Sequence, residues 1–273
     1  MKKYVNLFVF VFMIGACLSQ GRAQTKSAVS YKNPVVDIAM PDPTVIKAAD
    51  GYFYVYATES TRNVPIMKSK DLVEWTYCNT AFTNKTRPRF EPKAGIWAPD
   101  INYINGKYVL YYAMSVWGGE QTCGIGVATA DSPQGPFTDH GKMFRSNEIG
   151  VQNSIDPSFL QYEGRNYLVW GSFRGIYVIE LTADGLSIMP GAKKKRIAGT
   201  AFEAVYIHKH GDYYYMFASI GSCCQGVKST YKVVVGRSKK VWGPYKDKTG
   251  KPMLKNGYSS VSYTHLTLPT NSR

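Results

Sequence analysis

A short acidic motif, called the acidic phrase below, occurs four times along the chain and constrains the fold more than any other feature. Its acids are Asp42, Asp100, Asp156 and Glu203, separated by 58, 56 and 47 residues. A glycine follows each acid within nine residues, and an aromatic-rich run follows each glycine. The sequence therefore predicts a repeated unit with one carboxylate at the same place in every copy.

Each unit is predicted to contain about four short strands. In the second unit, residues 101–104 and 108–114 are apolar and aromatic runs joined at Asn105-Gly106, a dipeptide typical of tight β-hairpins. Units of roughly 45 to 60 residues with four strands are typical of β-propeller blades, whose first strands line a central channel. We therefore predict an all-β propeller whose four acids converge at one mouth of the channel. The alternative is that acids merely favour the turns beside strands.

Both ends of the chain are predicted to lie outside this domain. Residues 1–23 contain two lysines and then a short apolar run, which is typical of a secretory signal peptide. Two outcomes remain open, namely lipidation at Cys17 and ordinary cleavage after Ala23. We place the domain at residues 31–258, and we interpret residues 259–273 as a foreign tail on a chain truncated at its C-terminal end.

Charge and cysteine content set limits on the function. The net charge of +14 would suit nucleic acid or an anionic polysaccharide, but the basic residues are scattered apart from residues 193–196. A solvated surface is the preferred interpretation, and export argues against nucleic acid. The adjacent Cys223 and Cys224 either form a vicinal disulfide or remain two thiols, and the pairing of Cys78 and Cys123 cannot be deduced from sequence.

Converging carboxylates suit the hydrolysis of glycosidic bonds. Like charges raise one another's pKa, so that one acid stays protonated while another stays charged. Glu203 is the candidate general acid because of its longer side chain, and Asp42 is the candidate general base. Asp156 is predicted to lie between them, where it would tune the acid and orient the sugar.

Aromatic residues near the acids are candidates for contact with a sugar. Trp97 lies just before Asp100, and Phe173 follows Asp156 in the same unit. The apolar face of a sugar stacks well on such rings. We predict that Trp97, Asp100 and Phe173 bind the substrate, with packing between blades as the alternative. For Trp170, within a predicted strand, core packing is preferred.

The acidic phrases, together with the segment around Trp97, resemble the motifs of glycoside hydrolase family 43. Residues 221–226, which include the paired cysteines, and residues 235–238 resemble the endo-α-1,5-L-arabinanase branch of that family. The resemblance implies a five-bladed β-propeller, of which about four blades are present in this chain. It also implies an inverting mechanism with Asp42 as base, Asp156 as pKa modulator and Glu203 as acid.

The resemblance further implies a substrate and a cellular setting. The expected substrate is the arabinan of plant cell walls, cleaved at α-L-arabinofuranosyl linkages by an exported, periplasmic or extracellular monomer. No cofactor is expected for the chemistry and no residue is assigned to a metal, although the full-length family fold can hold a structural calcium in its channel. The alternatives are a β-xylosidase or α-L-arabinofuranosidase of the same family, and a non-catalytic glycan-binding propeller or inactive fragment. A retaining β-fructosidase fits less well, because Pro-Thr follows Asp42 and Ile precedes Asp156.

Overall fold

The computed structural model describes residues 30–260, which form short β-strands joined by turns. The chain divides into two compact units, Met1–Lys32 and Asn33–Arg273, and every described strand belongs to the second. The predicted signal peptide and Cys17 lie outside the described residues, as does the chain from residue 261 onward. Within the described part, no helix is long and apolar enough to cross a membrane.

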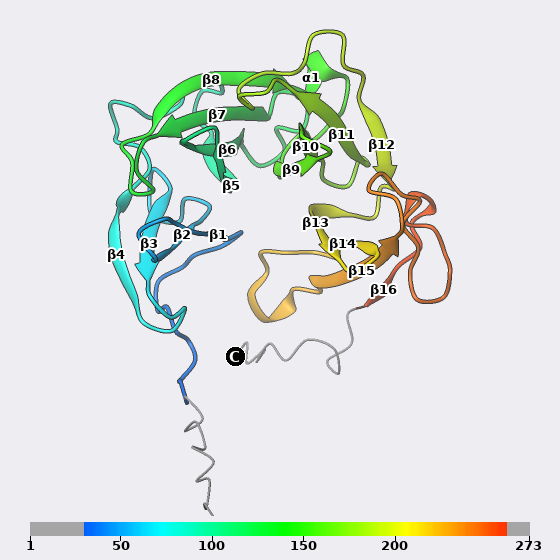
Figure 1. The fold of residues 1–273 in the computed structure, drawn as a ribbon, viewed down its shortest axis with the longest axis horizontal. Helices are drawn as coiled ribbons and strands as arrows, with labels where there is room; N and C mark the ends of the chain where they lie inside the picture. The colour runs from blue at the N-terminus through cyan, green and yellow to red at the C-terminus, as the bar shows by residue number, and fades with distance from the viewer. Residues whose placement is uncertain (1–29, 261–273) are drawn as a thin grey trace, which may run out of the picture. The chain divides into compact units, whose positions relative to one another are not determined.

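Four antiparallel sheets follow one another along the second unit, each with four strands in chain order (Figure 1). We call them blades 1 to 4. Their strands are β1 (Thr44–Lys47), β2 (Phe53–Tyr56), β3 (Pro65–Ser69) and β4 (Trp75–Thr80); β5 (Gly95–Ile104), β6 (Lys107–Ser115), β7 (Gly124–Ala130) and β8 (Thr138–Arg145); β9 (Ser158–Tyr162), β10 (Arg165–Trp170), β11 (Ile176–Leu181) and β12 (Lys195–Ala198); and β13 (Glu203–His210), β14 (Tyr213–Ile220), β15 (Lys232–Ser238) and β16 (Ser259–Ser260). The short helices are α1 (Ser146–Ile149), η1 (Gly226–Lys228) and η2 (Met253–Lys255). The predicted all-β propeller with four blades is confirmed.

The first strand of each blade is its inner strand. Strand β1 contacts β5, β5 contacts β9, and β9 contacts β13. Figure 1 shows these strands side by side, with the fourth strands of the blades farther out. Asp42, Asp156 and Glu203 lie at or just before the first residue of an inner strand, whereas Asp100 lies within β5. The arrangement of the blades therefore brings the four acidic segments close to one another.

Hydrophobic clusters fill the interfaces between successive blades. Tyr112 belongs to the cluster between blades 1 and 2, whereas its neighbour Tyr111 belongs to the cluster between blades 2 and 3. Successive side chains of a strand point to opposite faces of its sheet. A strand in a blade that packs against a neighbouring blade on each side must therefore be apolar on both faces. Trp170 is only 1% exposed in the second of these clusters, as its predicted place in the core requires. A third cluster joins blades 3 and 4.

The predicted hairpin is confirmed, and the last strand of the domain extends beyond the predicted C-terminal boundary. Asn105 and Gly106 join β5 to β6 with φ angles of 48° and 85°, as a tight turn of this type requires. Strand β16 pairs with β15 in the fourth blade. The predicted boundary at residue 258 therefore falls just short of the last strand, which takes the first two residues assigned to the tail.

Candidate active site

A residue with left-handed backbone marks the same point at the start of each inner strand. These residues are Asp42, Ala98, Asp156 and Ala204, with φ angles of 50°, 41°, 58° and 51°. Residues other than glycine rarely adopt this conformation, and it concentrates at functional sites. The backbone therefore turns sharply at the same position in all four blades.

The four acids do not all occupy this position. Blades 1 and 3 hold an aspartate there, whereas blades 2 and 4 hold an alanine. Asp100 lies two residues after the left-handed residue of its blade, and Glu203 lies one residue before. The prediction of one carboxylate at the same place in every repeat is therefore wrong. The reason is that the strand register shifts between Trp97 and Asp100 and between Glu203 and Tyr206, so that blades 2 and 4 contain β-bulges.

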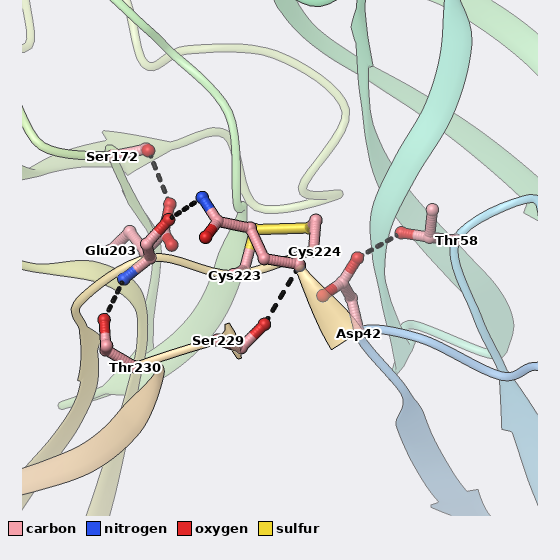
Figure 2. Close-up of a disulfide and its surroundings, with 10 residues drawn as sticks. Asp42, Thr58, Ser172, Glu203, Cys223, Cys224, Ser229 and Thr230 are labelled. Carbon is pink, nitrogen blue, oxygen red and sulfur yellow. Dashed lines mark hydrogen bonds between the residues drawn. A yellow bond between two sulfur atoms is a disulfide. The ribbon is translucent and has the colours of Figure 1, made fainter. Parts of the chain in front are cut away.

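Asp42 is exposed, and a single hydroxyl group orients its carboxylate. Thr58 Oγ1 donates a hydrogen bond to Asp42 Oδ2 at 2.6 Å (Figure 2). The backbone N–H of Ala98 donates to the same Thr58 oxygen at 2.7 Å. Because Thr58 Oγ1 already accepts one hydrogen bond, its own hydrogen is directed at Asp42.

Glu203 is partly buried and accepts hydrogen bonds from two side chains. Ser172 Oγ donates to Glu203 Oε2 at 2.7 Å (Figure 2), and Asn153 Nδ2 donates in turn to Ser172 Oγ at 2.9 Å. The hydroxyl of Tyr231 also hydrogen-bonds Glu203. Burial raises the pKa of Glu203, the two hydroxyl donors lower it, and the charge of Asp42 raises it, with a net increase.

Asp156 interacts with the charges of both Asp42 and Glu203. Its side chain is partly buried, and its Oδ2 accepts a hydrogen bond from the backbone N–H of Ala204 at 3.1 Å. Burial, followed by the charges of Glu203 and Asp42, raises the pKa of Asp156 well above its usual value. The structure therefore brings together Asp42, Asp156 and Glu203, three of the four acids that the sequence predicted to converge.

Asp100 lies in β5, and its carboxylate is bonded to residues of the neighbouring inner strands. Its Oδ2 accepts hydrogen bonds from Phe159 N and Asn102 Nδ2, both at 2.7 Å, and its carboxylate also bonds the side chain of Thr44. Burial raises the pKa of Asp100 to about 6. These partners lie in blades 1, 2 and 3, so Asp100 ties three inner strands together.

The predicted aromatic residues adjoin residues of the hydrogen-bond network around the acids, because Ala98 donates to Thr58 and Ser172 donates to Glu203. Trp97 precedes Ala98 and is partly buried against Ala113, Cys123 and Ile155. Phe173 follows Ser172, is partly buried, and has a left-handed φ of 51°. Their contact with a substrate stays a prediction.

A second tryptophan near Trp97 was not singled out from the sequence. Trp117 has its ring centroid 5.5 Å from that of Trp97 and is 78% exposed. A large exposed ring beside a half-buried one extends the aromatic surface into solvent. Since Trp117 lies in the loop after β6 rather than in a repeated phrase, the repeat did not point to it.

Three hydroxyl residues at the site, Thr58, Ser172 and Tyr231, were likewise not predicted. A weak signal existed, because Thr58 and Ser172 each lie two residues past the end of the second strand of a blade. Tyr231 directly precedes β15, and nothing local distinguishes it from the many other tyrosines.

The described residues offer no ligand set for a metal. Across residues 30–260, no group of three or more His, Cys, Asp or Glu side chains lies close enough together to hold an ion. No described residue is therefore assigned to a metal.

Comparison with known proteins agrees with the fold. The model of glycosyl hydrolases family 43 matches residues 31–266. The chain is 39% identical to an extracellular endo-α-(1→5)-L-arabinanase of Bacillus subtilis over 79% of this chain and 70% of that protein. It is 36% identical to an extracellular exo-α-(1→5)-L-arabinofuranosidase of Cellvibrio japonicus over 80% and 69%.

A solved structure shares the same architecture. The α-L-arabinanase of Cellvibrio cellulosa in complex with arabinohexaose superposes with a TM-score of 0.75 at 33% identity, covering 82% of this chain and 78% of that one.

Proposed function

The chain belongs to glycosyl hydrolases family 43, and we propose that it hydrolyses α-L-arabinofuranosyl linkages of arabinan with inversion of configuration. The observation that carries the proposal is the cluster of three carboxylates in which Asp156 and Glu203 have raised pKa values beside the exposed Asp42. Such unequal acids suit a reaction that needs one proton donor and one proton acceptor. The relatives named as arabinanases support the choice of sugar.

Glu203 acts as the general acid in this proposal. Its raised pKa favours retention of a proton on the carboxyl group. That proton moves to the glycosidic oxygen as the bond from this oxygen to the anomeric carbon breaks. Glu203 is left as a carboxylate, which the hydroxyl groups of Ser172 and Tyr231 then stabilise.

Asp42 acts as the general base. Its exposed carboxylate takes a proton from a water molecule whose oxygen attacks the anomeric carbon from the opposite face of the sugar. Thr58 bonds Oδ2 of Asp42, which holds the carboxylate in one orientation. Asp156 forms no bond to the sugar ring carbon and orients the sugar hydroxyls, while burial and the charge of Asp42 raise the pKa of the acid.

The aromatic residues and Asp100 support the site in different ways. Trp97 and Phe173 stack on the apolar face of bound sugars. We assign Asp100 to the joining of the inner strands rather than to substrate contact, because its carboxylate is occupied by protein donors. The partner is a plant cell-wall polysaccharide bound by a monomer. Export to the periplasm or the extracellular space, with or without a lipid on Cys17, agrees with relatives named as extracellular.

The test is hydrolysis of debranched α-1,5-linked arabinan by the protein and by its Glu203→Gln variant. Loss of the general acid is expected to lower kcat by about a thousandfold, while arabinohexaose binding stays nearly unchanged. Glu180→Gln, a matched change in β11 outside the site, should keep full activity. No release of reducing ends by the unaltered protein, or undiminished release by Glu203→Gln, would contradict the proposal. Binding without any turnover would instead favour the glycan-binding alternative.

A further inference from the structure

The loop between β14 and β15, residues 221–231, carries the disulfide between Cys223 and Cys224 and is called the disulfide loop below. In Figure 1 this loop extends from blade 4 toward blade 1. Figure 2 shows the disulfide between Glu203 on one side and Asp42 on the other. In Figure 2 the sulfur atoms lie between the proposed acid and the proposed base.

The disulfide loop is closed by its own hydrogen bonds. At its base, Ser222 N donates to Thr230 Oγ1 and Thr230 N donates to Ser222 O, both at 3.0 Å. Toward its tip, Gln225 N donates to Ser229 Oγ at 3.0 Å, and Gln225 Nε2 donates to Ser222 Oγ at 2.9 Å. None of these hydrogen bonds involves a sulfur atom, so they do not depend on the disulfide for their donors or acceptors.

The end of the disulfide loop is joined directly to the catalytic cluster. Tyr231, its last residue, hydrogen-bonds Glu203, and the Ser219 side chain of β14 hydrogen-bonds Tyr231. The loop is thus anchored at the carboxylate that the proposed mechanism uses as its acid.

The disulfide is an apolar feature in a polar segment. Its neighbours in the loop are glycines and Ser, Gln, Lys and Thr side chains, apart from Tyr231 at its end and Val227, which is 97% exposed. Cys223 is half-buried and Cys224 is exposed. Joining adjacent cysteines closes a small ring whose side chains no longer rotate freely, and sulfur is polarizable and packs well against apolar groups. The ring therefore presents a rigid apolar surface beside Asp42 and Glu203.

We propose that the Cys223–Cys224 disulfide is a substrate-contacting surface, against which the C–H face of the arabinofuranosyl unit between Asp42 and Glu203 packs. This inference rests on the proposed function, because it names the same sugar. A furanose has hydroxyl groups for the carboxylates and an apolar face that needs a partner. Reduction or substitution of the two cysteines opens the ring and removes that partner.

The experiment compares Cys223→Ser/Cys224→Ser with the unaltered protein on debranched arabinan, and repeats the comparison for arabinohexaose binding in the Glu203→Gln background. KM and Kd are expected to rise about tenfold, the usual effect of losing one buried apolar contact, with kcat changed by less than about threefold. Unaltered protein reduced with a phosphine, with mass spectrometry to confirm the opened disulfide, should behave like the double variant. Cys78→Ser, which changes a free cysteine in β4, is the matched control.

Two further readouts separate contact from a purely structural role. If the disulfide only stiffened the loop that carries Tyr231, the pH profile of kcat/KM would move with the hydrogen bond to Glu203, and the melting temperature would fall. Contact with substrate predicts that the pH profile and the melting temperature stay in place. Unchanged KM and Kd, or a shifted pH profile, would overturn the inference while leaving the proposed function intact. Failure of the unaltered protein to bind or cleave arabinan would overturn both.

Discussion

Thr58 shows how one hydroxyl group can fix the orientation of a proposed catalytic base. It accepts a hydrogen bond from Ala98 of blade 2 and donates one to Asp42 of blade 1. Ser172 has the same relation to Asn153 and Glu203. The types of the three acids were predictable because each lies in a repeated phrase. Their hydroxyl partners were not, since each contact joins residues far apart in the sequence.

Removal of the Thr58 hydroxyl should impair the base without removing it. Thr58→Val keeps the shape of the side chain but loses the donor to Asp42 and the acceptor for Ala98 N–H. A hydrogen bond to a charged group contributes about 1.5–3 kcal/mol, so kcat is expected to fall roughly tenfold to a hundredfold. Thr58→Ser retains the hydroxyl and should restore most of the rate. Equal kcat values for the two variants would rule out this role for the hydroxyl.

Tyr231 should set the upper pH limit of activity. Burial raises the pKa of Glu203, whereas hydrogen bonds from Ser172 and Tyr231 lower it. Tyr231→Phe removes one of the lowering bonds, so the pKa of Glu203 rises and the acid stays protonated to higher pH. The alkaline limb of the kcat/KM profile is therefore expected to move upward, because that profile reports the free enzyme. Tyr103→Phe, at an exposed site in β5, should leave the limb in place, and a downward shift in Tyr231→Phe would be inconsistent with the bond.

At the scale of elements, the bulges in β5 and β13 decide where the acids lie. They place Asp100 inside the strands and Glu203 ahead of the left-handed residue, although both acids lie in similar phrases. A bulge adds a residue to one strand only and leaves no reliable mark in sequence. The inner strands could therefore be located from the repeat, but their register could not. Asp100 thus became a link between blades instead of a fourth member of the catalytic cluster.

Stability should depend on pH through Asp100. Burial raises its pKa to about 6 in the folded protein, above its value in the unfolded chain. A raised folded-state pKa means that the stabilising contribution is fully present below the unfolded pKa and is lost as the pH rises through about 6. Relative to Asp100→Asn, which does not titrate, the unaltered protein should lose up to about 2–3 kcal/mol of unfolding free energy between about pH 4 and pH 7.

Urea unfolding at both pH values measures this difference. The exposed turn residue Asp212 provides a control, since Asp212→Asn should show no comparable dependence. A difference between Asp100→Asn and the unaltered protein that is constant across the range would mean that Asp100 titrates normally.

At the scale of the whole molecule, the repeat predicted the blades because its period matches one four-stranded sheet. The aromatic runs also agree with a propeller, because a strand of a blade that has a neighbouring blade on each side is buried on both faces. Tyr111 and Tyr112 of β6 show this burial. What the repeat cannot encode is any contact between blades or loops. The approach of the disulfide loop to Asp42 and Glu203 depends on the positions of all four blades, so only the folded structure places it there.

The central claim is that Asp42, Asp156 and Glu203 form an inverting acid–base site. Proton NMR of the anomeric signals during early hydrolysis of α-linked arabinan tests it directly, because a water molecule activated by Asp42 attacks the face opposite to the departing sugar. The account predicts that new reducing ends appear first as the β-anomer and only later equilibrate with the α-anomer. Initial formation of the α-anomer would mean retention through a covalent intermediate, and it would contradict the roles assigned to these three acids.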